Sequence, residues 1–291
     1  MFRINVPLKR SRDVEALVSA GADAFYGGLL DQGVTALNAR PNPFSNFTEV
    51  ADLQRAIQNC HENGATFHLT LNARVLTEAD ESRFLDQVRI AKDSGVDGVI
   101  LANHNALLSV KEFAPDMSLA ASVNFGVLNE LAARQLARFG ISRIILPRHL
   151  TPKEIDAIAK SCPDIEFEAL ILNEKCGYYD AYCGFHQDKI CGLSWNDQGC
   201  SAIGASRVNT FKNNACGACF LPTFADSIGL IKVVGRRRSL ESLVNGVSFF
   251  VELRNMLEAG CPVGEFKANT PSIYRKYFGV ACGHDCHYER E

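Results

Sequence analysis

Short apolar stretches alternate along this chain with longer segments in which apolar residues recur every three or four positions. The short stretches predict buried strands, and the longer segments predict amphipathic helices. The expected strands are Phe2–Val6, Ala24–Gly27, Thr66–Leu71, Gly98–Leu101, Ser118–Ala121, Arg143–Leu146, Glu166–Leu172 and Leu230–Val234. The expected helices include Asp13–Ala20, Glu49–Asn63, Glu78–Ser94, Asn129–Phe139 and Pro152–Ser161. This order is typical of βα units arranged around a parallel sheet.

Eight strands with helices between them indicate an α/β fold, and we expect a (β/α)8 TIM-like barrel. A chain of 291 residues has an ordinary length for such a barrel, although a doubly wound open sheet would give a similar alternation. We expect one barrel-like domain over residues 1–260, with a cysteine-rich, cluster-binding insertion at residues 168–222. Residues 261–291 are expected to form a C-terminal tail that packs on the barrel.

The C-terminal ends of the strands form the active face of a barrel of this kind. The residues predicted at this face include Tyr26, Asn72, Asn103, His104, Ser122, Asn124, Arg148, Asn173 and Lys232. Arg148 ends a strand and could hold a carboxylate through two parallel hydrogen bonds, or form a surface salt bridge instead. His104 and His149 are placed for acid–base chemistry, whereas His68 falls inside a strand and is expected to be a core histidine.

The net charge of -3 and an isoelectric point near 6.2 predict no general attraction to nucleic acid or to anionic lipid. Arg236, Arg237 and Arg238 form a local basic run, so RNA stays open as a partner. The N-terminus enters a predicted strand directly, without the pattern of a signal peptide. No apolar stretch approaches the roughly 18 residues of a membrane span. We therefore expect a cytoplasmic protein without a membrane span.

Cysteines are concentrated in one part of the chain, because six of the eleven lie between Cys176 and Cys219. In a reducing compartment, clustered thiols are more often metal ligands or redox groups than disulfides. Soft, anionic thiolates suit the iron of an iron–sulfur cluster, which is the predicted ligand of this segment. Structural zinc uses the same four-cysteine ligands and is the alternative. Inert, partly buried thiols are a third interpretation.

A second group of potential ligands lies near the C-terminus, in the sequence Cys282-Gly-His284-Asp-Cys286-His287. These side chains could bind another metal ion, with Cys261 or a symmetry-related chain completing the site. The alternative is a tail that only folds over the barrel. The sequence leaves both interpretations open.

Several short phrases of the chain match one known family in the same order. They are Gly21-Ala-Asp-Ala-Phe-Tyr26-Gly27, Asn46-Phe-Thr48, Leu71-Asn72, Gly95-Val-Asp-Gly-Val-Ile100, Arg143-Ile-Ile-Leu-Pro-Arg148, Cys176-x6-Cys183, Gly199-Cys200, Cys219-x2-Pro222 and Ile231-Lys-Val-Val-Gly-Arg236. On these phrases the chain resembles peptidase family U-thirty-two, the collagenase-like family. The resemblance implies a barrel-like fold with an oxygen-sensitive [4Fe–4S] cluster.

The resemblance also implies which cysteines hold the cluster. The spacing is similar to that of the UbiU-type members of the family, and the implied ligands are Cys176, Cys183, Cys200 and Cys219. Cys191 and Cys216 are then expected to be non-ligands, with Cys216 as the substitute for Cys219.

The implied function is oxygen-independent hydroxylation of a small aromatic or quinone-precursor substrate, with prephenate as the expected oxygen donor. UbiU-type proteins work with a homologous partner subunit, so an electron-transfer or accessory role in a hetero-oligomer is one alternative. An RNA-base hydroxylase is another, although the added C-terminal domain of the larger RNA-modifying members is not expected here. A protease is the least favoured, because the chain has no His-Glu-x-x-His motif.

Three phrases depart from the family pattern. Leu172-Asn-Glu-Lys175 stands where the family usually has a His-Gly pair, and Val234 replaces the acidic residue of Lys-Ile-Glu-Gly-Arg. Ser122-Val-Asn124 stands where a Ser-x-Gln phrase is expected. The expected fold and cluster do not depend on these positions, whereas the acceptor substrate stays open.

Overall fold

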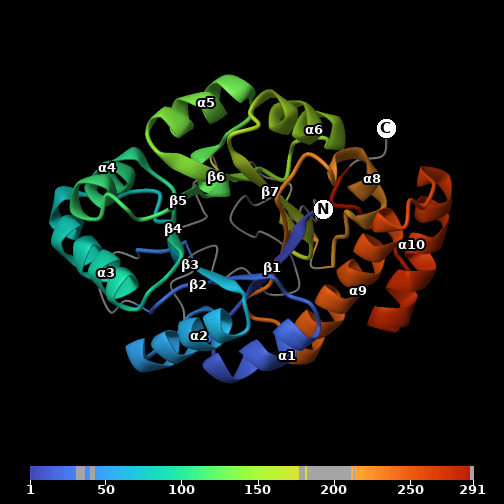
Figure 1. Ribbon diagram of the computed structural model, residues 1–291, viewed down its shortest axis with the longest axis horizontal. Coiled ribbons are helices and arrows are strands. Elements are labelled where there is room, and N and C mark those ends of the chain that lie inside the picture. Colours follow the sequence, from blue (N-terminus) through green and yellow to red (C-terminus); the bar gives the residue numbers. More distant parts are fainter. Residues whose placement is uncertain (31–36, 40–42, 177–180, 182–210, 213, 289–291) are drawn as a thin grey trace, which may run out of the picture.

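Eight parallel strands close into a barrel in the computed structural model, which describes residues 1–30, 37–39, 43–176, 181, 211–212 and 214–288. The strand order around the barrel is β1-β10-β7-β6-β5-β4-β3-β2, so β10 closes the ring against β1 (Figure 1). The strands are β1 Arg3–Pro7, β2 Ala24–Gly27, β3 Thr66–Leu71, β4 Gly98–Leu101, β5 Leu119–Ala121, β6 Ile141–Leu146, β7 Glu166–Leu172 and β10 Leu230–Val233. The predicted TIM-like barrel is therefore confirmed.

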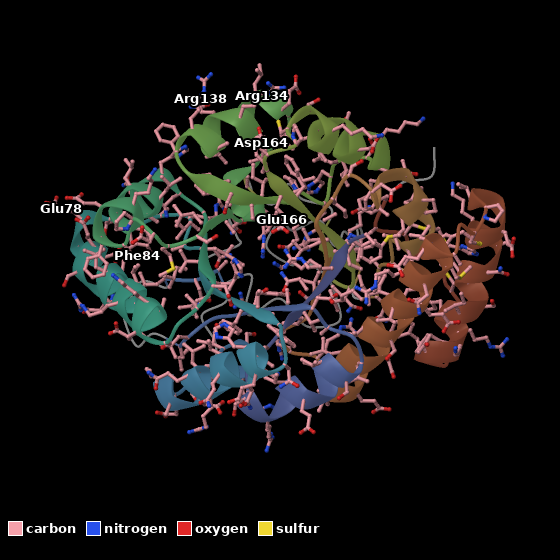
Figure 2. The ribbon with its side chains drawn as sticks, viewed as in Figure 1. Glu78, Phe84, Arg134, Arg138, Asp164 and Glu166 are labelled. Carbon is pink, nitrogen blue, oxygen red and sulfur yellow. The ribbon has the colours of Figure 1, made fainter. Side chains whose placement is uncertain are left out.

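Helices surround the barrel and cover its outer face (Figure 1). They are α1 Val14–Ser19, α2 Val50–Glu62, α3 Glu81–Asp93, α4 His104–Phe113, α5 Glu130–Arg138, α6 Pro152–Ser161, α8 Leu221–Phe224, α9 Leu240–Glu258 and α10 Val263–Phe278. Each longer helix buries one face, as α2 does with Leu53, Ile57 and Cys60. The opposite faces are polar, and Figure 2 shows Arg134 and Arg138 on the outer side of α5.

The sequence pattern located the strands to within two residues. β2, β3, β4 and β7 have the predicted bounds, whereas β6 begins at Ile141 rather than Arg143. The start of α6 also follows from sequence, because Thr151 and Glu154 form a reciprocal capping box and Pro152 occupies the first turn. Among the described residues, no helix combines the length and apolar character that a membrane crossing requires.

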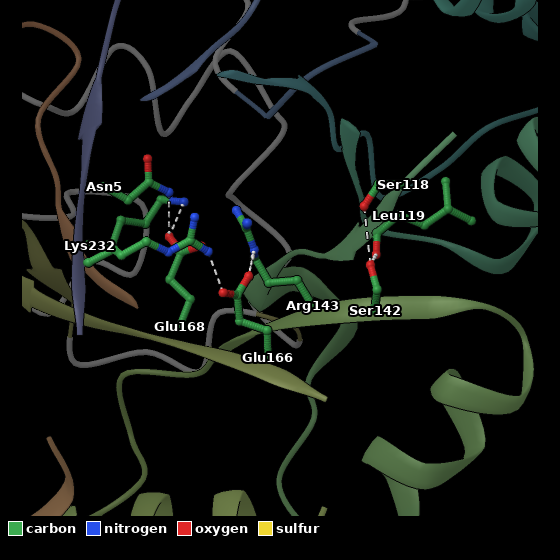
Figure 3. A network of polar contacts seen from close by, with 9 residues as sticks. Asn5, Ser118, Leu119, Ser142, Arg143, Glu166, Glu168 and Lys232 are labelled. Carbon is green, nitrogen blue, oxygen red and sulfur yellow. Dashed lines mark hydrogen bonds and ion pairs between the residues drawn. The ribbon is translucent and has the colours of Figure 1, made fainter. Parts of the chain in front are cut away.

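Charged side chains fill part of the barrel interior (Figure 3). Lys232 Nζ donates to Glu168 Oε1 at 2.7 Å, and Asn5 Nδ2 donates to the same oxygen at 3.0 Å. Nearer the N-terminal ends of the strands, Glu166 pairs with Arg143, at 2.6 Å, and with Arg3. A buried charge without partners is costly. The contacts with Lys232, Arg143 and Arg3 therefore stabilise the carboxylates of Glu168 and Glu166 inside the barrel.

The C-terminal part of the chain packs on the barrel and then returns to the end of β7. α10 packs against α9 through aromatic side chains, including Phe249 and Phe278, whose ring centroids lie 5.4 Å apart. After α10, the segment 279–288 runs beside the residues that precede α8, where Cys216 and Cys286 form a parallel β-bridge. A small antiparallel pair, β8 Lys175–Cys176 and β9 Phe211–Lys212, lies within the cysteine-rich segment 168–222.

Candidate functional site

A cavity of about 80 Å³ opens at the C-terminal ends of the barrel strands, and we call it the mouth cavity. The polar side chains that line it are Thr70, Asn72, Ser122, Asn124, Arg148, Glu174, Lys232 and Arg236, together with the ring of Tyr26. They come from six different strand ends, which is typical of the active face of this fold. The cavity has room for several water molecules or for one carboxylate group.

Lys232 lies at the floor of the mouth cavity. Its ammonium group is 3.8 Å from the centroid of the Tyr26 ring and bonds to the fully buried Glu168. Burial lowers the pKa of Lys232, and the Glu168 carboxylate opposes that shift. The arrangement places a positive charge between a carboxylate and the face of an aromatic ring, both of which favour a cation.

Arg236 also lines the mouth cavity, and its guanidinium lies 5.5 Å from the centroid of the same Tyr26 ring. Its Nη2 donates to Thr70 Oγ1 at 2.8 Å and its Nη1 donates to Asn46 Oδ1 at 3.2 Å. The backbone of Gly28 approaches closely here, because a Cβ on this residue would lie 2.2 Å from Asn46 Oδ1. Gly28 therefore leaves the space in which Asn46 can orient the guanidinium.

Arg148 is the third cation of the mouth cavity, as the end-of-strand position predicted. It is buried, and its Nη1 donates to the carbonyl oxygen of Glu174. Both Asn173 and Glu174 have left-handed backbone conformations, with φ of 67° and 46°. Such conformations are costly for residues other than glycine and persist where surrounding contacts hold them. Asn173 Nδ2 supplies one such contact by donating to Val234 O at 3.0 Å.

Asn124 points an unsatisfied amide at the mouth cavity. The residue is only 6% exposed, and neither Oδ1 nor Nδ2 has a hydrogen-bond partner among the described residues. Ser122 holds the turn that carries it, because Ser122 Oγ accepts from Asn124 N and from Asn72 Nδ2, both at 3.3 Å. A buried amide without partners is unfavourable, so this group is available to a ligand that enters the cavity.

A larger cavity of about 530 Å³ lies between α6, α10 and the residues before α8, and we call it the thiol cavity. Four cysteines line it, namely Cys216, Cys219, Cys282 and Cys286. Burial raises the pKa of the Cys216 thiol, and the charges of Cys219, Cys282 and Cys286 act in the same direction. No three histidine, cysteine or acidic side chains of the described part of the chain are arranged to hold a single metal ion.

The structure places the sequence-predicted residues in different locations. Cys219 lies in the short helix η6 Ala218–Phe220 and lines the thiol cavity. Cys176 lies on β8, and its side chain is outside the described part of the structure, as are Cys183, Cys191 and Cys200 altogether. The predicted ligand set is therefore not tested by the geometry.

The predicted acid–base histidines do not line the mouth cavity. His104 is exposed at the start of α4, and its ring packs edge-on against Phe125, with centroids 5.3 Å apart. His149 follows Arg148 and is half-buried. His68 is buried in β3 as expected for a core histidine, and burial, followed by the charges of Arg143 and Lys232, lowers its pKa well below the ordinary value.

Several residues of the site were not singled out from sequence. Arg236 belongs to a basic run of the kind that usually forms a solvated surface, yet its guanidinium is fixed in the mouth cavity. Its position directly after a predicted strand was the available signal. Glu168 and Glu174 had no such signal, because one lies inside an apolar strand and the other depends on an irregular backbone.

The sequence profile described as peptidase family U32 matches residues 9–276. The chain is 28% identical to tRNA hydroxylation protein P of Escherichia coli (strain K12) over 163 residues, which is 56% of this chain and 34% of that protein. It is 24% identical to a collagenase of Porphyromonas gingivalis (strain ATCC BAA-308 / W83) over 176 residues, 60% of this chain and 38% of that protein. The chain thus matches little more than a third of the length of these two relatives.

The fold is similar to that of a solved U32 peptidase, with a TM-score of 0.54 and 14% sequence identity. The match covers 81% of this chain and 94% of the other. At this identity the likeness concerns the barrel fold alone. It supports the strand order described above, and the chemistry has to be argued from the side chains of the site.

Proposed function

This chain belongs to peptidase family U32, and on that premise we propose that it takes part in hydroxylation of an aromatic acceptor, with the mouth cavity as the reaction site. Relatives in the family are named tRNA hydroxylation proteins. The observation that carries the proposal is the convergence of Arg148, Lys232 and Arg236 on one cavity. A protease would need a different set of groups, and the sequence has no His-Glu-x-x-His motif.

The three cations favour an anionic oxygen donor. A dicarboxylate such as prephenate would place one carboxylate against Arg148, whose planar guanidinium can donate two parallel hydrogen bonds. Lys232 and Arg236 supply further positive charge in the same cavity. The amide of Asn124, which lacks partners among the described residues, can donate to or accept from the donor's remaining oxygens.

The proposal includes an iron–sulfur cluster bound by cysteines of the segment 176–219. The family pattern predicts Cys176, Cys183, Cys200 and Cys219 as its ligands, and thiolates are the donor type that such clusters require. Replacing C–H by C–OH removes two electrons from the acceptor, and the oxygen donor takes them up when its own C–OH bond is replaced by C–H. A cluster bound by these cysteines would supply a route for electron transfer.

The acceptor is a planar ring that meets the donor at the opening of the mouth cavity, because the cavity itself has room for one carboxylate group. The three departures from the family phrases all lie at this cavity, because Asn124, Glu174 and Val234 line it. We therefore expect the acceptor to differ from that of members with the usual phrases. A small aromatic molecule or quinone precursor is one candidate.

An RNA base is the second candidate, and a basic rim beside the cavity favours it. Lys9, Arg10 and Arg237 follow the C-terminal ends of the adjacent strands β1 and β10. Burial lowers the pKa of Lys9, and the charges of Arg10 and Arg237 act in the same direction. Clustered cations of this kind can contact the phosphates of a nucleic acid.

The proposal is tested with protein purified without oxygen and supplied with prephenate and either tRNA or a quinone precursor. Mass spectrometry should detect one added oxygen atom in an acceptor, and Arg148→Met should abolish the product. A homologous partner subunit is added in a parallel reaction. Product that forms only with the partner, and that persists with Arg148→Met, would show an accessory role and contradict the proposal.

A further inference from the structure

Lys232 brings a primary amine to the mouth cavity, and an amine is the group that condenses with carbonyl compounds. Its side chain is 7% exposed and lies between the Glu168 carboxylate and the Tyr26 ring. We propose that Lys232 forms an imine with the carbonyl group of an α-keto acid, so that the oxygen donor is held by a covalent bond. Prephenate belongs to this class of acids. The inference rests on the mouth cavity being the donor site of the proposed function.

The surroundings of Lys232 match those that activate lysines for imine formation. The amine reacts after it loses its proton, and both an apolar environment and a second cation favour that loss. The second cation is Arg236, because its guanidinium carbon and Lys232 Nζ lie 5.5 Å and 3.8 Å from the centroid of the Tyr26 ring. Burial lowers the pKa of Lys232, Glu168 opposes that shift, and the charge of Arg236 adds to it. The apolar residues that line the same cavity are Ile100, Ile145, Leu170 and Val234.

Glu168 is placed to move the proton that the reaction requires. Its Oε1 lies 2.7 Å from Lys232 Nζ and accepts a second hydrogen bond from Asn5 Nδ2 at 3.0 Å (Figure 3). Glu168 is fully buried, and its Oε2 has no hydrogen-bond partner among the described residues. The carboxylate can therefore accept the ammonium proton of Lys232 and pass it to the departing oxygen.

The condensation balances without an oxidant or a reductant. The Lys232 ammonium group transfers one proton to Glu168, and the free amine attacks the carbonyl carbon of the α-keto acid, which forms the C–N bond. The carbonyl oxygen leaves as water, and this water takes one proton from the nitrogen and one from Glu168. The product is an iminium cation next to the Glu168 carboxylate, so the ion pair of the resting protein is kept.

The contacts that hold the ammonium group also stabilise this product. A carboxylate and the face of an aromatic ring both attract cations, and an iminium carries the same charge as an ammonium group. The Tyr26 ring is fixed through its hydroxyl, which donates to Val233 O at 3.2 Å. The site therefore accommodates the cation before and after condensation, and the neutral amine is needed only during the attack.

The carboxylate of an α-keto acid has its own partner in the mouth cavity. Arg148 lines the same cavity as Lys232, and a guanidinium suits a carboxylate. Because the carboxylate of an α-keto acid is attached to the carbonyl carbon, the two side chains would hold neighbouring groups. An α-hydroxy acid offers no carbonyl group, and a simple aldehyde offers no carboxylate. The pair of side chains therefore selects α-keto acids.

The experiment traps the imine with sodium cyanoborohydride, which reduces an iminium to a stable secondary amine. The purified protein is incubated with pyruvate or with phenylpyruvate as the probe. Lactate is the matched control, because it keeps the carboxylate of pyruvate but lacks the carbonyl group. Peptide mass spectrometry should find the adduct on Lys232 with both probes and none with lactate.

Two variants and a control variant locate the reaction. Lys232→Arg keeps a positive charge beside Glu168 and should give no adduct by intact mass. Glu168→Gln keeps the amine but removes the proton acceptor, and should slow adduct formation by about 100-fold. Lys160→Arg is the control, because Lys160 also pairs with a carboxylate, that of Asp156 at 2.8 Å, but its side chain is 67% exposed. This control should keep the full yield of adduct.

The trapping result is independent of the hydroxylation assay, because it needs no acceptor. Absence of an adduct on Lys232, or an equal yield on Lys160, would overturn the inference. An adduct on Lys232 in a protein that hydroxylates no acceptor would support the inference and contradict the proposed function. Hydroxylated product from a protein that gives no adduct would overturn the inference and leave the proposed function standing.

Discussion

The Nε2 atom of His287 lies 2.8 Å from the carbonyl oxygen of Asn173. This contact joins the C-terminal segment to the end of β7, where Glu174 accepts a hydrogen bond from Arg148. Cys286, which lines the thiol cavity, precedes His287, and Arg148 lines the mouth cavity. The adjacent residues Cys286 and His287 on one side, and Asn173 and Glu174 on the other, therefore link the thiol cavity to the mouth cavity.

Replacing His287 tests that connection. His287→Phe removes a buried hydrogen bond and leaves the Asn173 carbonyl without this partner, so we expect a loss of about 1–3 kcal/mol in the free energy of unfolding. Urea unfolding followed by circular dichroism measures it. His284→Asn, at an exposed position of the same segment, should change stability by less than about 0.5 kcal/mol. Equal losses in the two variants would contradict a specific role for the contact.

Replacing only Lys232 of the Lys232–Glu168 ion pair should lower the free energy of unfolding far more than replacing both residues. Lys232→Met leaves the fully buried Glu168 carboxylate without its ion-pair partner, and we expect a loss of about 3–5 kcal/mol in unfolding free energy. Adding Glu168→Gln removes the stranded charge and should restore part of that loss, since the amide can still accept from Asn5. A double variant no more stable than Lys232→Met would show that the buried charge is not the cause.

Acid should destabilise the protein through His68. Burial and the charges of Arg143, Lys232 and Arg3 lower its folded-state pKa well below 6.5, so the native protein keeps this histidine neutral. The unfolded chain binds the proton below about pH 6.5, and this contribution to stability is present above that pH and lost as the pH falls. The loss approaches about 1.4 kcal/mol per pH unit.

The pH dependence of stability in histidine variants tests whether His68 causes the acid sensitivity. Urea midpoints between neutral pH and about pH 5 should fall less steeply in His68→Gln than in the parent protein. His104→Gln, which removes an exposed histidine, should retain the parent's slope. Identical slopes in all three proteins would show that His68 does not control the acid sensitivity.

Arg148 should govern affinity for the donor. Arg148→Lys keeps the charge but removes the planar pair of donors, and the loss of about 1.5–3 kcal/mol corresponds to roughly 10- to 150-fold weaker binding of prephenate by calorimetry. Arg134→Lys is the matched control, because Arg134 is exposed on α5 (Figure 2). Binding that is unchanged in Arg148→Lys would remove this residue from the donor site.

The barrel could be predicted from sequence because its strands carry an unmistakable pattern. β4 and the last four residues of β7 are apolar runs that are buried throughout, whereas in β3 the apolar residues Phe67, Leu69 and Leu71 alternate with polar ones. The helices have one buried face and show the helical repeat. Strand ends then identified Arg148, Asn124 and Lys232 as mouth residues.

The return of the C-terminal segment could not be predicted in the same way. Its pairing with Cys216 joins residues that are far apart in the sequence and uses main-chain groups, which carry no sequence signal. His104 shows where prediction from strand ends fails. It also follows a strand, but it is the first residue of α4 and packs against Phe125. Position after a strand therefore identifies the face, whereas side-chain direction depends on the local backbone.

Transfer of labelled oxygen tests the central claim most directly. Prephenate that carries ¹⁸O in its hydroxyl group is incubated with the anaerobically purified protein, with tRNA or a quinone precursor as the acceptor, in unlabelled water. We predict that the hydroxylated acceptor carries the heavy isotope and that Arg148→Met yields no such product. A product with oxygen from water, or label transfer that persists in Arg148→Met, would contradict hydroxylation in the mouth cavity.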